Sequence, residues 1–164
     1  MATADVPAPI PLSFELNGSQ VEANIPPQRF LVDLLRDVFE LKGVKRSCDM
    51  QVCGACTVLL DGQLVSSCTL LALEVRGRSV KTIEGYVQDP RSTAVLDAFI
   101  ENASLQCGFC TPGMVLAVRA LLDRTPSPSE DEIKDYLSGN VCRCTGYKKI
   151  VEAVQQAALE GDTR

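Results

Sequence analysis

The stretch of sequence that decides the fold runs from Ser47 to Cys68, SCDMQVCGACTVLLDGQLVSSC. Its cysteines follow the spacing C-x4-C-x2-C, and a fourth cysteine lies beyond a turn at Asp61-Gly62. The segment is loop-like up to the third cysteine, and the short apolar runs around the turn then predict a β-hairpin. We therefore expect four thiols close together beside a small sheet: Cys48, Cys53, Cys56 and Cys68.

A second group of four cysteines lies in the C-terminal half as a C-x2-C pair and a C-x-C pair: Cys107, Cys110, Cys142 and Cys144. The chain has eight cysteines and no histidine. Inert buried thiols would be scattered along apolar faces, whereas these are clustered. No signal peptide is expected, and cytosolic thiols are kept reduced, so four disulfides are not expected either. We interpret both groups as metal ligands.

The composition excludes several classes of function. The 164 residues are 46% hydrophobic and 23% charged, as in an ordinary globular chain. No apolar run approaches the roughly 18 residues of a membrane span, so we expect no membrane insertion and a cytoplasmic localisation. The net charge of −5, without a basic stripe, argues against a nucleic-acid partner and favours a protein partner.

The N-terminal half alternates in the manner of a small α+β domain. Residues 1–10 are rich in alanine and proline and are expected to be a flexible tail, with order beginning near Pro11. Alternating apolar residues on both sides of Asn17-Gly18 predict a hairpin. The apolar spacing from Phe30 to Leu41 predicts a helix whose apolar stripe is Phe30, Leu31, Leu34, Leu35 and Val38. With the second hairpin and a last strand near residues 79–84, this domain spans 11–85.

The C-terminal half, 86–160, is predicted to be a small helical bundle. Each cysteine pair precedes an expected helix, where the positive end of the helix dipole favours thiolates. Ser129 and Glu132 form the sequence of a capping box. The expected helices are 93–105, a buried one that follows the cap Thr111 and Pro112, a short one from Ser129 to Gly139, and one after the cap Thr145. The apolar stripe of the last helix is Tyr147, Ile150, Val151, Val154 and Ala158.

The cysteine spacing narrows the choice of metal. C-x4-C-x2-C with a distant fourth cysteine is typical of plant-type 2Fe-2S ferredoxins, and Gly54 inside the loop allows backbone N–H groups to approach the cluster. The second group suits another 2Fe-2S cluster, although a four-cysteine zinc site remains an alternative there. Without histidine or a glycine-rich phosphate loop, the chain lacks the usual residues for substrate chemistry, so we expect no catalytic residues and an electron-transfer role.

Three stretches together resemble a known family: CDMQVCGACTVLLDGQLVSSC, LQCGFCTPGM and GNVCRCTGYKKIV. They resemble the small iron–sulfur subunit of the molybdenum hydroxylases, the family of xanthine dehydrogenase, aldehyde oxidoreductase and aerobic carbon monoxide dehydrogenase. The resemblance covers 12–158. It implies an α+β chain in which a plant-ferredoxin-like β-grasp domain (11–85) precedes an all-α four-helix-bundle domain (86–160) with a second 2Fe-2S cluster.

The resemblance also implies roles and partners. Cys48, Cys53, Cys56 and Cys68 would hold the cluster nearer a flavin, and Cys107, Cys110, Cys142 and Cys144 the cluster nearer molybdenum. Gln106 and Cys144 would contact the pterin of the molybdenum cofactor. Electrons would pass from a large subunit with the molybdopterin cofactor, in its cytosine dinucleotide form, to FAD on a medium subunit. The expected assembly is a heterotrimer or a dimer of heterotrimers, and the large subunit would select the substrate, a purine, aldehyde, N-heterocycle or carbon monoxide.

Two alternatives and one departure accompany this interpretation. The chain is alternatively a free-standing ferredoxin-type carrier, or a structural zinc-binding interaction module.

Many members of the family have glycine where this chain has Ser47 and Gln51. Because hydrogen bonds around the ligands tune a cluster, we expect the potential of the first cluster to be shifted and the two clusters to differ in potential.

Overall fold

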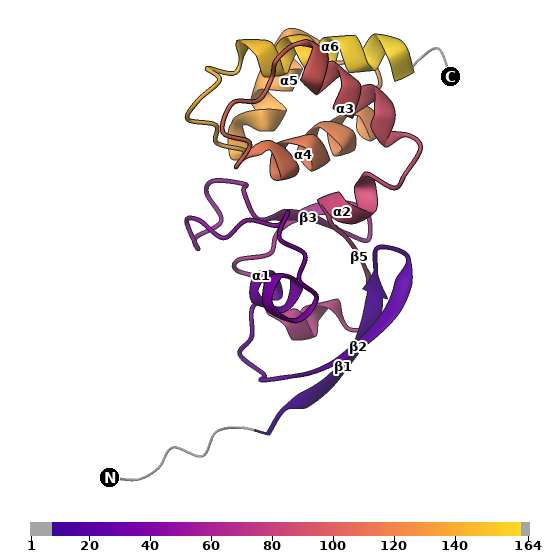
Figure 1. Cartoon of the computed structure of the whole chain (residues 1–164), viewed down its shortest axis with the longest axis vertical. Coiled ribbons are helices and arrows are strands. Elements are labelled where there is room, and N and C mark those ends of the chain that lie inside the picture. Colours follow the sequence, from indigo (N-terminus) through magenta and orange to yellow (C-terminus); the bar gives the residue numbers. More distant parts are fainter. Residues whose placement is uncertain (1–7, 162–164) are drawn as a thin grey trace.

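The structure, a computed structural model, describes residues 8–161. A half that contains a sheet and a helical half are stacked along the long axis of the molecule (Figure 1). Of the expected tail, residues 1–7 lie outside the described residues, and the first strand begins at Ile10, one residue before the expected start of order. Among residues 8–161, no helix is long and apolar enough to cross a membrane.

The N-terminal half is a mixed five-stranded sheet in the order β2-β1-β5-β3-β4. β1 and β5 are parallel, and the other neighbours are antiparallel. Both expected hairpins are confirmed, because Asn17-Gly18 and Asp61-Gly62 adopt the positive φ angles that a tight type I′ turn requires. The strands are β1 (Ile10–Leu16), β2 (Ser19–Ile25), β3 (Thr57–Leu60), β4 (Gln63–Ser66) and β5 (Ser79–Lys81).

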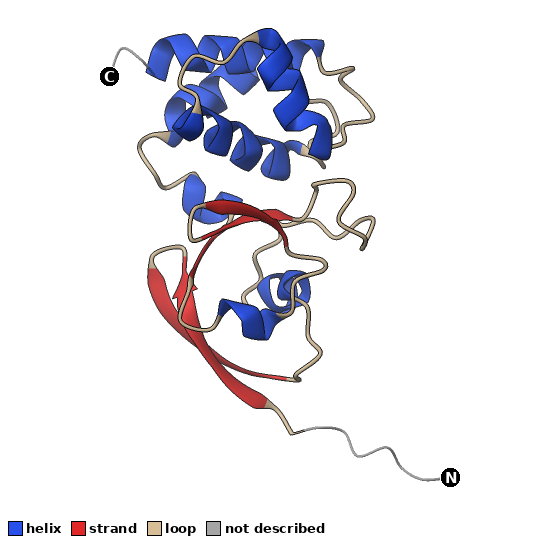
Figure 2. Cartoon of the chain, turned by 180° about the vertical axis from the view of Figure 1, so that it is seen from behind, coloured by secondary structure: helices blue, strands red, loops and turns tan. Residues whose placement is uncertain are grey.

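The sheet wraps around one helical segment, as Figure 2 shows. This segment was expected to be a single α-helix, but α1 (Leu31–Asp33) continues into a π-helix, η1 (Leu34–Val38). The wider turn, closed by a hydrogen bond from Phe39 N to the carbonyl of Leu34 (3.2 Å), rotates later residues off the apolar stripe. Val38, which was expected on that stripe, is therefore 48% exposed, so this part of the prediction is wrong.

The helical half contains four main helices, as expected, and the most buried of them is α4 (Thr111–Arg124). Ser129 caps α5 through a capping box with Glu132, which confirms that prediction. The start of α6 differs from the prediction, since Gly146 and Tyr147 have positive φ angles and the helix begins only at Lys148. The main helices are α3 (Ser92–Glu101), α4 (Thr111–Arg124), α5 (Glu130–Tyr136) and α6 (Lys148–Gly161). The short helix predicted after Ser129 ends in a 3-10 turn, η3 (Leu137–Gly139). The sequence did not predict η2 (Ala72–Val75), nor α2 (Ile83–Tyr86), which replaces the end of the strand expected near residues 79–84.

The two halves are packed closely against each other between β3 and α4. Leu59 of β3 belongs to the hydrophobic core of the helical half. A Cβ atom added to Gly113, in the first turn of α4, would lie only 2.2 Å from the carbonyl oxygen of Gly54. The first cysteine loop is thus pressed against the N-terminal end of α4, beside the second cysteine group.

Candidate metal centres

The first cysteine group lies on the loop before β3 and just after β4. Cys48 and Cys53 are half-buried in the loop, whereas Cys56 and Cys68 are buried at its base. The carbonyl of Cys56 accepts hydrogen bonds from both the hydroxyl (2.7 Å) and the amide (3.3 Å) of Ser67, which fixes the two sides of the base together. The fold therefore brings the four expected cysteines of this group to one place.

The loop has the backbone of an anion-binding nest. Asp49 and Gln51 have positive φ angles of 54° and 61°, and Gly54 has 67°. Such a path turns backbone N–H groups inwards. Hydrogen bonds from the N–H groups of Met50 and Val52 lower the pKa of the Cys48 thiol to about 6.

At the buried base of the first group, the thiol pKa is raised rather than lowered. Burial raises the pKa of the Cys56 thiol to about 11, and the neighbouring Cys68 thiol contributes to the shift. A buried thiolate is stable when a cation neutralises it, as a metal ion does. The loop thus combines an exposed, donor-rich end with a buried end where a metal ion would supply the missing positive charge.

The second cysteine group lies where α3 and α4 are joined and on the loop before α6. Cys107 and Cys144 are exposed, Cys110 is half-buried and Cys142 is buried. The Sγ atoms of Cys107 and Cys144 are 3.5 Å apart. Cys110 occupies the N-cap position of α4, where the sequence had placed Thr111, and Cys144 lies four residues before α6 rather than directly before its cap.

The pKa values within the second group follow burial and hydrogen bonding. Burial raises the pKa of the Cys110 thiol to about 12. Burial also acts to raise the pKa of Cys142, but hydrogen bonds outweigh it and lower that pKa, and the largest of them comes from the hydroxyl of Thr145, 3.1 Å from Sγ. A hydrogen bond from the N–H group of Phe109 lowers the pKa of Cys107.

The eight thiols contact one another in pairs. This pairing can be compared with the arrangement of cysteines that each kind of metal site requires. The contacts join Cys48 with Cys53, Cys56 with Cys68, Cys107 with Cys144, and Cys110 with Cys142. A tetrahedral zinc ion needs four ligands around one point, whereas each iron of a 2Fe-2S cluster takes two cysteines. The donor set and its pairing fit a two-iron cluster in each group.

Hydrogen bonds join the loop that carries the first cysteine group to the loop that carries Cys142 and Cys144. The amide of Val141 donates to the carbonyl of Cys53 (2.9 Å), and the side-chain amide of Asn140 donates to the carbonyl of Gly54 (3.2 Å). Val141 is adjacent to Cys142 in the chain. A cysteine of one group is thus separated from a cysteine of the other by one hydrogen bond and one residue.

Three residues near the second cysteine group in the chain make hydrogen bonds to the loops that carry the cysteines. Gln106 is exposed and its amide nitrogen donates to the carbonyl of Cys144 (3.1 Å), so the structure brings together the two residues expected at a pterin. Asn140 makes a hydrogen bond to the loop of the first cysteine group, and Tyr147 makes one to the loop of the second. The sequence did not indicate either hydrogen bond. Tyr147 was expected only on the apolar stripe of the last helix, and apolar spacing does not reveal that its hydroxyl bonds to Cys142 and Asn140, five and seven residues back in the chain.

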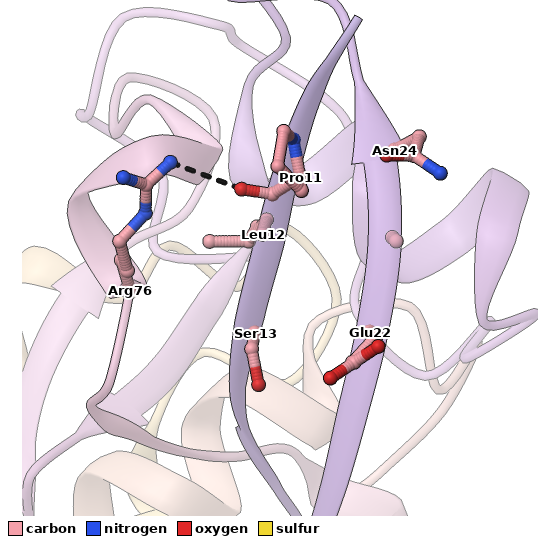
Figure 3. Close-up of a pocket in the computed structure, with 7 residues that line it drawn as sticks. Pro11, Leu12, Ser13, Glu22, Asn24 and Arg76 are labelled. Carbon is pink, nitrogen blue, oxygen red and sulfur yellow. Dashed lines mark hydrogen bonds between the residues drawn. The ribbon is translucent and has the colours of Figure 1, made fainter.

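A hollow on the β1–β2 hairpin carries no cysteine. Figure 3 shows it beside Pro11, where Arg76 donates from its guanidinium to the carbonyl of Pro11 (3.0 Å). Its lining is Pro11, Leu12, Ser13, Glu22, Ala23, Asn24 and Arg76. The hollow lies at the end of the hairpin near the N-terminus, and none of the eight cysteines lines it. Figure 1 shows this end of β1 and β2 on the side of the molecule away from the helical half.

Comparison with known proteins places both halves of the chain. Residues 14–82 match a family described as "2Fe-2S iron-sulfur cluster binding domain", and residues 82–155 match a "[2Fe-2S] binding domain". The chain is 43% identical over 148 residues to "Nicotinate dehydrogenase small FeS subunit" of Eubacterium barkeri, covering 90% of this chain and 94% of that protein. It is 34% identical over 174 residues to "Aldehyde oxidoreductase iron-sulfur-binding subunit PaoA" of Escherichia coli, covering 96% of this chain and 76% of that one.

A solved structure agrees with these relatives. The crystal structure of quinoline 2-oxidoreductase from Pseudomonas putida 86 contains a chain that superimposes with a TM-score of 0.90 at 39% identity. The match covers 96% of this chain and 98% of that chain. The expected α+β fold, with a ferredoxin-like half before a helical half, is confirmed. The chain belongs to the small 2Fe-2S iron–sulfur subunits of the molybdenum hydroxylase family.

Proposed function

We propose that this chain relays electrons, one at a time, from a molybdopterin centre on a large partner subunit to FAD on a medium partner subunit. When bound, a 2Fe-2S cluster supplies reversible one-electron chemistry. The observation that carries the proposal is the juxtaposition of the two cysteine groups, joined by the hydrogen bond from Val141 to Cys53. A structural metal site would not require a second group at this position.

Each thiol pair would hold one iron. The first cluster would bind to Cys48, Cys53, Cys56 and Cys68, and the second to Cys107, Cys110, Cys142 and Cys144. The pairwise contacts of the sulfur atoms support this assignment. We place the domain boundary at the expected position, 11–85 and 86–160, which is supported by two hydrophobic clusters whose buried members divide there except for Leu59.

The second group would face the large subunit. Gln106 and Cys144 are both exposed and bonded to each other, so they would present one polar edge to the pterin of a molybdopterin cofactor in its cytosine dinucleotide form. The side chains of Leu105, Phe109 and Val141 are apolar and exposed, and each lies within three residues of Gln106 or Cys144 in the chain. Exposed apolar side chains of this kind suit burial against a protein partner. The assembly would be a heterotrimer, or a dimer of heterotrimers, located in the cytoplasm.

This chain would not select the substrate and would perform no catalysis on it. Its relatives are named for different substrates, among them nicotinate, caffeine and aldehydes, although all are at least 34% identical to it. Similar small subunits thus occur in complexes with different substrates, which supports placing substrate choice and hydroxylation on the large subunit.

Metal analysis of the native complex tests the proposal. We expect about four iron and about four labile sulfide per chain, together with co-purified subunits that carry molybdopterin and FAD. About two zinc per chain would instead indicate a structural zinc module. Purification of the iron-containing chain alone would indicate a free-standing ferredoxin.

A further inference from the structure

Tyr147 has a backbone conformation that a bulky residue rarely adopts. Its φ angle is 66°, in the left-handed region, and it directly follows Gly146 in the same region. A bulky residue in the left-handed region is strained, and such strain persists where the surrounding contacts enforce it. The contacts of Tyr147 therefore indicate what the strained conformation is for.

The side chain of Tyr147 reaches back to the second cysteine group. Its hydroxyl accepts a hydrogen bond from the amide of Cys142 (2.8 Å) and donates one to the carbonyl of Asn140 (3.0 Å). Its backbone amide donates to the hydroxyl of Thr145 (3.3 Å), which itself donates to Sγ of Cys142 (3.1 Å). Both the amide and the sulfur of Cys142 are thus tied to Tyr147.

The same three residues, Asn140 to Cys142, are held from the other side by the first cysteine loop. The side chain of Asn140 donates to Gly54, and the amide of Val141 donates to Cys53. Gly54 admits this approach because it has no side chain, since a Cβ atom there would lie 2.5 Å from the Asn140 amide nitrogen. The segment is therefore fixed between Tyr147 and the first cysteine loop.

We propose that Tyr147 is a positioning residue for electron transfer between the two cysteine groups, a proposal that rests on the proposed function. Its hydroxyl fixes segment 140–142, and with it Cys142, against Cys53. With a 2Fe-2S cluster held by each cysteine group, the step would transfer one electron from the second group, which would be oxidised, to the first group, which would be reduced. No bond forms or breaks and no proton moves. Tyr147 affects this step through the position and the hydrogen bonds of Cys142, which influence the potential of its cluster.

Tyr147→Phe removes only the hydroxyl, and Tyr136→Phe is the matched control. Tyr136 is a half-buried tyrosine of the same helical half, and within residues 8–161 its hydroxyl makes no hydrogen bond. Both variants are to be studied in the native complex by redox titration followed by EPR. In Tyr147→Phe we expect one 2Fe-2S signal to shift, with a severalfold change in its reduced-to-oxidised ratio at a fixed potential. The other signal, and both signals of Tyr136→Phe, should be unchanged.

The outcomes separate the inference from the proposed function. If the unmodified complex lacks two 2Fe-2S signals, the proposed function fails and the inference fails with it. If both signals are present and Tyr147→Phe leaves both unchanged, only the inference is overturned. Selective loss of two of the four irons in Tyr147→Phe would support it.

Hydrogen exchange in the unmodified complex gives a second measurement that does not depend on the variant folding. Slow exchange of the Cys142 amide is expected because it is bonded to the Tyr147 hydroxyl. Exchange as fast as that of an unprotected loop amide would overturn the inference.

Discussion

Gly54→Ala is the substitution that most directly tests the close packing of the two halves. Gly54 has a φ angle of 67°, and an added Cβ would lie 2.5 Å from both the Asn140 amide nitrogen and the Gly139 carbonyl oxygen. A left-handed alanine costs about 1–2 kcal/mol. Displacing a backbone carbonyl and breaking the bond from Asn140 adds about 1–3 kcal/mol, the cost of an unpaired buried polar group.

Two matched controls separate these contributions. Gly62→Ala has the same conformational cost, since φ is 81°, but nothing lies within 4 Å of the added Cβ. Gly113→Ala has no positive φ angle, but its Cβ would lie 2.2 Å from the Gly54 carbonyl. We therefore expect Gly62→Ala to lose about 1–2 kcal/mol of unfolding free energy and Gly54→Ala to lose about 2–5 kcal/mol.

Thermal unfolding of the full chain measures the difference. At about 2–4 °C per kcal/mol for a chain of this size, Gly54→Ala should unfold several degrees below Gly62→Ala. Gly113→Ala should be destabilised although it carries no left-handed strain. Equal midpoints for Gly54→Ala and Gly62→Ala would refute the argument that the first cysteine loop is pressed against Asn140.

Three further predictions concern single side chains. The hydroxyl of Tyr86 is buried without a hydrogen-bond partner within residues 8–161, and burial raises its pKa to about 12; Tyr86→Phe should therefore raise the unfolding free energy by up to about 1 kcal/mol, measured by urea unfolding. Hydrogen bonds from Arg91 hold the pKa of Asp89 well below its usual value, so Asp89 stabilises the fold above about pH 4, and this stabilisation is lost as the pH falls through the lowered pKa. Asp89→Asn should therefore have a smaller unfolding free energy than the unmodified chain at pH 7. If this difference in unfolding free energy is undiminished at pH 2, the ionised Asp89 carboxylate is not its cause. Gln51→Gly relieves left-handed strain but removes the hydrogen bond from Thr69 (3.3 Å) and adds the entropy cost of glycine, so the unfolding free energy should change by less than about 1 kcal/mol while the potential of one cluster should shift; identical potentials would show that Gln51 does not tune it.

The parts of the fold that depend on neighbouring residues could be predicted from the sequence. Asn17-Gly18 and Asp61-Gly62 form the expected tight turns because the left-handed angles are local properties of those residues. The capping box at Ser129 likewise depends only on a residue three positions away. Cysteine spacing alone located both candidate centres.

The parts that depend on contacts between distant residues could not be predicted. Asn140 bonds to Gly54 across 86 positions of the chain, and nothing near Asn140 indicates this partner. The periodicity that predicted helix from Phe30 onwards does not reveal the π-turn that leaves Val38 exposed. The bonds of Tyr147 are short in sequence, to Cys142 and Asn140, but apolar spacing shows only where a side chain could pack and not the left-handed conformation that turns its hydroxyl back.

One EPR experiment tests the relay most directly. The native complex would be reduced stepwise with dithionite and its spectrum recorded at each potential. The account predicts two 2Fe-2S signals with different midpoints, and a splitting from their magnetic interaction once both clusters are reduced, because the hydrogen bond from Val141 to Cys53 holds the two groups side by side. A single signal, or two signals without any interaction, would contradict it.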